Sequence, residues 1–276
     1  MEFPVYVRLG SLTLHPHWVF EVLAYFLGTR LYLAIKSRWG DPVRDEDRWT
    51  VVAAAVVGCA LGSKLLYWLS DPAVMLEHWH DPVFLLGGKS IVGGLIGGLI
   101  AVEWVKQRIG VTRSTGDLFG VPLAVGIAVG RIGCFLTGLD DHTYGLPTTL
   151  PWGVDFGDGL PRHPAQLYET AFLLLVMTPL LLYSRRRPHR EGDLFKTFMV
   201  VYMGFRLLLE AIKPGVFFGG LNAIQWACLG TLVYYGWLYY RARDAREHDD
   251  EQWAPAVFRS RPGRSKPVRT RQVTGG

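Results

Sequence analysis

Hydrophobic residues along this chain fall into long runs that are separated by short polar stretches. Runs of this length with few charges are typical of helices that cross a lipid bilayer. The pattern predicts about seven spans, at residues 18–36, 51–69, 90–105, 117–137, 166–184, 194–212 and 222–240. We therefore expect an all-α polytopic membrane protein with about seven transmembrane helices.

The composition agrees with this pattern, because half of the residues are hydrophobic and only 19% are charged. The first residues lack the basic start and apolar centre of a cleavable signal peptide, so we expect the first span to act as the insertion signal. The three cysteines show no CxxC spacing, which predicts neither a metal site nor a disulfide framework. No organic cofactor is indicated.

Positive charges gather in alternate loops between the expected spans. The basic loops cover residues 36–48, 106–113 and 185–190, whereas the intervening loops carry little more than Lys89, Arg162 and Lys213. Basic loops remain on the cytoplasmic side of a membrane. This distribution predicts an N-terminus outside, a C-terminus in the cytoplasm and a structured outer loop between the fourth and fifth spans.

The chain divides by composition into a transmembrane domain, residues 1–240, and a basic tail, residues 241–276. The tail is polar and poor in aliphatic residues, so we expect it to be disordered. Association with anionic lipid head groups explains its charge better than nucleic-acid binding does.

Several ionisable residues lie inside the apolar runs, where a charge is costly without a partner. With the expected orientation, Arg131, Arg206, Glu210 and Glu169 fall at one depth, in the outer half of the membrane. Arg206 and Glu210 are four residues apart and share a helical face. Guanidinium groups present paired donors to phosphate, so the pattern favours a polar site that binds a phospholipid head group.

The signature stretches of the chain, in order, are "LGSLTLHPHW", "GGKSIVGGLIGG", "GRIGCFLTG", "PRHPAQLYE" and "YMGFRLLLEAIKP". Together they resemble the prolipoprotein diacylglyceryl transferase family over residues 3 to 240. The resemblance implies a bacterial inner-membrane enzyme whose active site faces the outer leaflet. It also implies transfer of the diacylglyceryl group of phosphatidylglycerol to the thiol of a lipobox cysteine in a prolipoprotein. We separately expect a monomer.

The resemblance also implies roles for individual residues. Arg206, Glu210 and His163 would be catalytic, and Arg131 would bind the lipid phosphate. The remaining substrate-binding residues would be Gly130, Gly133, Gly138, Gly93, Gly94, Arg162, Gln166, Tyr168 and Glu169.

Four positions differ from the polar residues that the family usually carries, and here they are Val19, Val92, Cys134 and Leu139. Three interpretations therefore stay open. In the first, the chain is an active transferase with a rearranged base, for which His142, Asp140, Asp141 and His163 could substitute. In the second, it acts on phospholipid head groups with another acceptor, with Cys134 as a thiolate beside Arg131. In the third, it binds lipid without catalysis.

Overall fold

The structure, a computed structural model, describes residues 2–259 of the chain. The chain divides into two units, residues 1–233 and 234–276, and the first unit contains the helix bundle. Its main helices are α1 (Pro16–Trp39), α2 (Asp45–Ser70), α5 (Ile91–Ile109), α6 (Gly120–Thr137), α7 (Ala165–Ala171), α8 (Thr178–Arg185) and α9 (Asp193–Leu209). A π-helical segment, η3 (Phe172–Met177), joins α7 to α8.

Short elements connect these helices. They are α3 (Pro72–Glu77), α4 (Pro82–Leu86) and the 3-10 turns η1 (Gly116–Leu118), η2 (Gly138–Asp141) and η4 (Glu210–Ile212). Three antiparallel hairpins complete the unit: β1 (Val7–Leu9) with β2 (Leu12–Leu14), β3 (Val154–Asp155) with β4 (Pro161–Arg162), and β5 (Phe217–Phe218) with β6 (Leu221–Asn222).

The predicted helical class is confirmed, since each of the seven predicted stretches falls on a helix. Within residues 2–259, four helices are long and apolar enough to cross a membrane: Pro16–Trp39, Asp45–Ser70, Gly120–Asp141 and Ala165–Arg185. The last helix, α10 (Ala223–Arg259), continues beyond residue 241, where the composition favours disorder. The division into a transmembrane domain and a basic tail, and the disorder expected of that tail, stay predictions. Residues 260–276 lie outside the described part of the chain.

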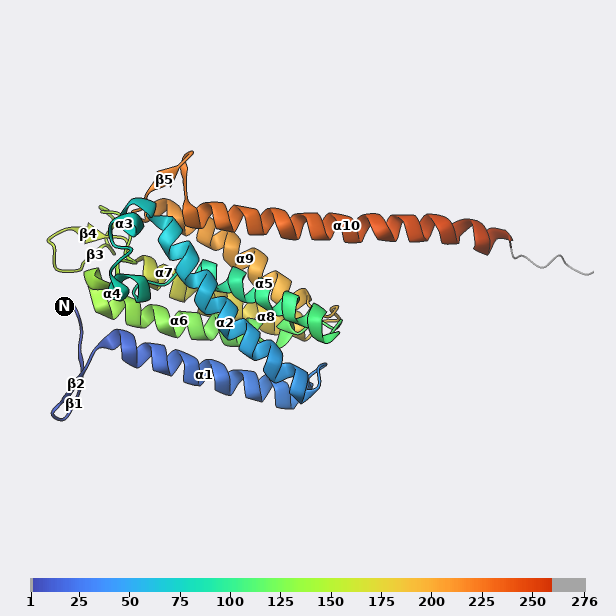
Figure 1. The fold of residues 1–276 in the computed structure, drawn as a ribbon, viewed down its shortest axis with the longest axis horizontal. Coiled ribbons are helices and arrows are strands. Elements are labelled where there is room, and N and C mark those ends of the chain that lie inside the picture. Colours follow the sequence, from blue (N-terminus) through green and yellow to red (C-terminus); the bar gives the residue numbers. More distant parts are fainter. Residues whose placement is uncertain (1, 260–276) are drawn as a thin grey trace, which may run out of the picture. The chain divides into compact units, whose positions relative to one another are not determined.

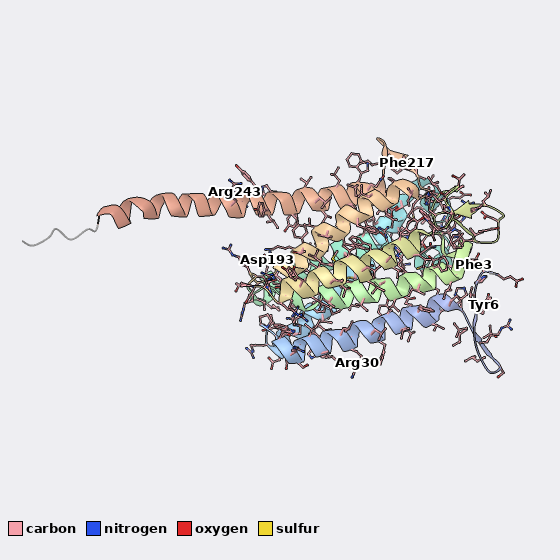
Figure 2. The ribbon with its side chains drawn as sticks, turned by 180° about the vertical axis from the view of Figure 1, so that it is seen from behind. Phe3, Tyr6, Arg30, Asp193, Phe217 and Arg243 are labelled. Carbon is pink, nitrogen blue, oxygen red and sulfur yellow. The ribbon has the colours of Figure 1, made fainter. Side chains whose placement is uncertain are left out.

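The hairpins and short helices lie at one end of the bundle, and the α1–α2, α5–α6 and α8–α9 connections lie at the other (Figure 1). Figure 2 shows Phe3 and Phe217 at the hairpin end and Asp193 at the opposite end. Phe3 forms an aromatic cluster with Phe135 and Phe156, with ring centroids 5.1–5.7 Å apart. This cluster fixes the N-terminal segment against the end of α6.

Local sequence explains where α5 begins and ends. Ser90 caps its first turn by accepting a hydrogen bond from the backbone N–H of Gly93, at 3.2 Å. Gly110 ends it in a left-handed conformation, with φ of 73°, and donates its N–H to the carbonyl of Lys106. Ser at the N-cap and Gly just past the last turn are the residues that satisfy exposed helix-end groups best.

Small residues bring α2 and α5 into close backbone contact. A Cβ atom added to Gly62 would lie 2.8 Å from the Cα of Gly97 and closer still to the carbonyl oxygen of Gly93. Gly58 meets Gly97 and Ala101 in the same way. Such small-xxx-small seams allow helices in a membrane to pack without a hydrophobic driving force.

Gly62→Ala is expected to destabilise the protein by about 1–3 kcal/mol, because the new methyl group must push the two backbones apart. Gly230→Ala in α10 is the matched control, since its added Cβ would meet no atom within 4 Å. The control gains helix propensity and is expected to be neutral or stabilising. Thermal unfolding of the detergent-solubilised variants measures both, and equal midpoints would contradict the packing argument.

A buried ion pair holds the connection between α1 and α2. Arg48 donates to both carboxylate oxygens of Asp41, from Nε at 2.7 Å and from Nη2, and also to the carbonyl of Thr115 at 3.1 Å. Burial of Asp41 would by itself raise the pKa of its carboxyl, but the bonds from Arg48 and from the Val43 N–H outweigh burial and lower it. The pair thus links the first connection to the segment before α6.

Asp41→Asn is expected to cost about 3 kcal/mol at neutral pH, because Arg48 is left buried without its counter-charge. The pair stabilises the folded state above the ordinary carboxyl pKa of about 4 and loses this effect as pH falls through the lower folded pKa. The unfolding midpoint of the parent protein should therefore fall more steeply below pH 4 than that of the variant. Glu46→Gln, which changes an exposed pair with Arg44, is the control; parallel pH profiles for the parent protein and Asp41→Asn would refute the assignment.

Candidate functional site

A buried carboxylate, Glu169, lies between two arginines that come from different helices. The Nε of Arg131, on α6, is 2.8 Å from Glu169 Oε2 in an ion pair. Arg206, on α9, donates from Nη1 to both Glu169 oxygens at 3.1 and 3.0 Å. Tyr202 donates its hydroxyl to Glu169 Oε1 at 2.5 Å. All four side chains are buried or nearly so, which makes these contacts stronger than they would be in water.

The same network continues through Glu210, one helical turn after Arg206. Arg206 Nη2 donates to Glu210, and Lys213 Nζ lies 3.4 Å from the same carboxylate. Asn222 reaches the other oxygen of Glu210 at 3.3 Å. Asn222 and Gln225 also exchange side-chain-to-backbone hydrogen bonds at 3.0 and 2.8 Å, which is a capping box at the start of α10.

The charges in this network do not balance. It contains three cations, Arg131, Arg206 and Lys213, and two carboxylates, Glu169 and Glu210, all of them less than 9% exposed. Within the network the cations therefore exceed the carboxylates by one, and the carboxylate of Asp141, close to Arg131, is itself engaged by His17 at 3.0 Å. A singly charged anion such as a phosphodiester would neutralise the excess.

The two arginines differ in what they can offer to a ligand. Arg206 uses both terminal nitrogens on carboxylates, so it is anchored on two sides. Arg131 uses Nε for Glu169, and its terminal fork makes only a 3.9 Å contact with Cys134 Sγ among the described contacts. Arg131 is thus the residue whose fork is free for a planar, bidentate acceptor such as phosphate.

A second sign of a polar ligand is Gln166, which opens α7 and is 1% exposed. Neither its amide nitrogen nor its amide oxygen has a hydrogen-bond partner among the described residues. Buried amide groups are normally satisfied, since leaving one unpaired costs about 1–3 kcal/mol. Gln166 lies three residues before Glu169, so a polar ligand bound at the network could supply the hydrogen bonds that its amide lacks.

The π-helical segment η3 follows directly after the helix that carries Gln166 and Glu169. Wider turns of this kind are often found at functional sites. Thr170 on α7 also donates to the carbonyl of Ala128 on α6 at 3.2 Å, which holds the two helices together beside the network.

A second polar group, formed by His17, Cys134 and Asp141, adjoins Arg131 through Cys134. His17 Nδ1 lies 3.0 Å from Asp141 Oδ1, and Cys134 approaches both residues. Their ligand atoms all lie within 4.8 Å of one another, and within residues 2–259 these three side chains form the group that could hold a metal ion.

Three predicted site residues, Arg162 on β4, His163 and Tyr168 on α7, contact neighbouring side chains of this segment rather than the arginines of the network. His163 Nδ1 is 3.2 Å from the hydroxyl of Tyr168, which also accepts from Trp152 Nε1 at 2.8 Å. Arg162 pairs with Asp158 and lies over the ring of Tyr144, 5.0 Å from its centroid. The described contacts therefore give none of these three residues a bond to Arg131 or Arg206.

The predicted glycines serve mainly in packing. Gly93 closes the α2–α5 seam, where an added Cβ would lie 2.6 Å from Leu66 Cβ, and Gly94 has ordinary contacts in the same seam. Gly133 faces Phe20 of α1, and Gly138, with φ of 77°, faces Phe3. Gly130 alone among the five has open space at the position of a Cβ. These contacts explain the residues without a ligand, and their binding roles stay predictions.

Four residues of the network were not predicted from the sequence: Tyr202, Lys213, Asn222 and Gln225. Tyr202 precedes Arg206 by one helical turn, so its position on the same face was available from spacing. The capping box was available from the "NAIQ" stretch. The contact of Asn222 with Glu210 depends on how the chain returns through the β5–β6 hairpin, which no local signal reports.

Comparison with known proteins places the chain in a family. The family model described as prolipoprotein diacylglyceryl transferase matches residues 4–241. A protein of Bordetella avium named phosphatidylglycerol--prolipoprotein diacylglyceryl transferase is 34% identical over 241 residues, which cover 82% of this chain and 89% of that protein. A Geobacter sulfurreducens protein of the same name is 32% identical over 222 residues, covering 76% and 82%. With a match of this extent, the chain belongs to the prolipoprotein diacylglyceryl transferase family.

Proposed function

We propose that this protein transfers the diacylglyceryl group of phosphatidylglycerol to the lipobox cysteine thiol of a prolipoprotein. The observation that carries the proposal is the unbalanced positive charge of the buried Arg131–Glu169–Arg206 network. Phosphatidylglycerol presents a single phosphodiester charge, which would complete the balance. The names of the relatives supply the same donor and the same class of acceptor.

The arrangement of the network gives each residue a role. The fork of Arg131 would bind the phosphodiester, and Gln166 would satisfy one of its oxygens through the unpaired amide. The acceptor sulfur attacks the glyceryl carbon that carries the phosphodiester oxygen, and the C–O bond breaks as the C–S bond forms. Glycerol phosphate then leaves with the electron pair, and the fixed charge of Arg206 stabilises it in a dry site.

The carboxylates of the network orient the arginines and do not attack. Glu169 fixes both guanidinium groups, and Glu210 holds Arg206 from the other side. His163, Tyr168 and Arg162 would shape the loop through which the lipobox peptide enters.

The proposed orientation places the hairpin end outside and the three basic connections in the cytoplasm, with about seven spans in a bacterial inner membrane. The basic loops all lie at the end opposite the hairpins (Figure 1), as the positive-inside rule requires. The network then lies toward the outer leaflet, where prolipoproteins are exposed after export.

Expression in bacterial cells depleted of their own transferase tests the proposal. The protein should restore the diacylglyceryl modification, read as the mass of the N-terminal peptide of a reporter lipoprotein. A membrane-inserted, folded protein that restores nothing would refute the function. Head-group release from labelled phosphatidylglycerol without any lipobox peptide would favour another acceptor instead.

Arg131→Gln is expected to lower kcat/KM by about 10²–10³, because the phosphate loses its charged, bidentate donor in the transition state. Arg131→Lys should recover only part of this loss, since an ammonium keeps the charge without the fork. Arg113→Gln is the control, because Arg113 is exposed and pairs with Glu191. Equal rates for Arg131→Lys and the parent protein would show that the fork geometry is not used.

A further inference from the structure

A compact set of three potential metal ligands adjoins Arg131. His17 comes from the first turn of α1, Cys134 from the last turn of α6, and Asp141 from the end of η2. Their nitrogen, sulfur and oxygen atoms lie within 4.8 Å of one another, and His17 Nδ1 is 3.0 Å from Asp141 Oδ1. Ligand atoms on one tetrahedral zinc ion lie roughly 3.3–3.6 Å apart, so small side-chain rotations would close the site. We call these three residues the His–Cys–Asp corner.

The chemistry of the corner matches a zinc-like divalent ion. Thiolate, imidazole and carboxylate are the three ligand types that zinc takes in proteins. The thiolate and the carboxylate together carry two negative charges, which a divalent ion balances. Three protein ligands also leave a fourth position open, as in catalytic rather than structural zinc sites.

The groups around the corner are arranged as an outer shell of such a site. Thr143 donates to the second oxygen of Asp141 and fixes that carboxylate. Glu21 Oε2 lies 3.6 Å from His17 Nε2 and is buried without a hydrogen-bond partner among the described residues. Its other oxygen is held by Lys89 at 2.5 Å and Tyr25 at 3.0 Å. A carboxylate on the outer ring nitrogen of a metal-bound histidine fixes its tautomer and orientation.

This arrangement argues against a simple proton relay. In a cysteine–histidine–aspartate relay, the aspartate holds one ring nitrogen and the other nitrogen faces the nucleophile. Here the second ring nitrogen of His17 faces Glu21, while Cys134 lies on the side of Asp141. Cys134 and Asp141 therefore converge with His17 on a common point.

Arg131 does not prevent a cation from binding there. Its Nε lies 2.8 Å from Glu169, a carboxylate that it shares with Arg206, and its Nη1 lies 3.9 Å from Cys134 Sγ. An N–H group at that position can donate to a metal-bound thiolate. The corner and the phosphate-binding fork of Arg131 are thus neighbours.

We propose that His17, Cys134 and Asp141 hold a zinc-class divalent ion whose open position binds the acceptor thiol as a thiolate. This inference rests on the proposed function. The thiol of the incoming peptide would replace a metal-bound water and release its proton to solvent, because a metal deprotonates a coordinated thiol. The bound sulfur would then attack the glyceryl carbon held beside Arg131, forming the C–S bond while the phosphodiester C–O bond breaks.

Metal binding is measured first and without reference to activity. The full-length chain, carrying no polyhistidine tag, is stripped with a chelator in detergent and titrated with Co²⁺ as the optical substitute for Zn²⁺. We expect one ion per chain and a thiolate-to-cobalt charge-transfer band. Cys134→Ser should abolish the band, and Cys134→Asp should bind cobalt without it. Cys59→Ser is the matched control and should keep the full spectrum.

The outer-shell assignment has its own readout. Glu21→Gln should keep the charge-transfer band but weaken Co²⁺ affinity by about 10–100-fold. Addition of a lipobox peptide should intensify the band by supplying a second thiolate, whereas the same peptide with serine in place of cysteine should not. Absence of saturable one-to-one binding, or an unchanged spectrum in Cys134→Ser, would overturn the site.

The activity assay then separates the two proposals. Chelator-treated protein should lose transfer and regain it on addition of Zn²⁺. Full transfer by metal-free protein would overturn the metal inference and leave the proposed function intact. Stoichiometric metal binding together with a complete absence of lipobox transfer would overturn the proposed function and the catalytic role of the ion, while the ion-binding site itself would stand.

Discussion

The position of Glu169 between two guanidinium groups is the interaction on which the rest of the site depends. Three helices meet at this carboxylate: α7 carries it, α6 contributes Arg131, and α9 contributes Arg206 and Tyr202. A buried charge without a partner costs several kcal/mol. If one of these helices rotated or slid, a charged side chain on a neighbouring helix would be left buried and unpaired. The electrostatic network therefore specifies how the three helices are aligned as well as what they can bind.

The packing of the remaining helices leaves this network undisturbed. The glycine seam joins α2 to α5, and Gly133 joins α6 to α1, so backbone contact positions these helices. The N-terminal segment is held by the Phe3 cluster over the end of α6, next to Cys134. Close glycine contacts thus fix the spacing between helices, and the buried charges of Arg131, Glu169 and Arg206 form one polar centre among them.

Sequence reasoning succeeded where a relation is local or follows from membrane physics. The helical stretches, and the shared face of Arg206 and Glu210, follow from apolar run length and from the four-residue helical repeat. The pairing of Arg131 with Glu169 joins two helices, and only the fold brings these residues into contact. The same reason explains Cys134, whose sequence neighbours give no metal-binding spacing although His17 and Asp141 lie beside it in space. Gly93 and His163 show the converse, because a family motif does not reveal whether a residue packs or binds.

The π-helical segment between α7 and α8 affects the direction in which Glu169 points. A π turn holds one residue more than an α turn, and one residue corresponds to a rotation of about 100° around the helix axis. The extra residue lets Leu181 and Arg185 stay buried while Glu169, before it, faces Arg131 and Arg206. Shortening the chain by a single position within Phe172–Met177 would restore a regular helix and turn Glu169 away from both arginines.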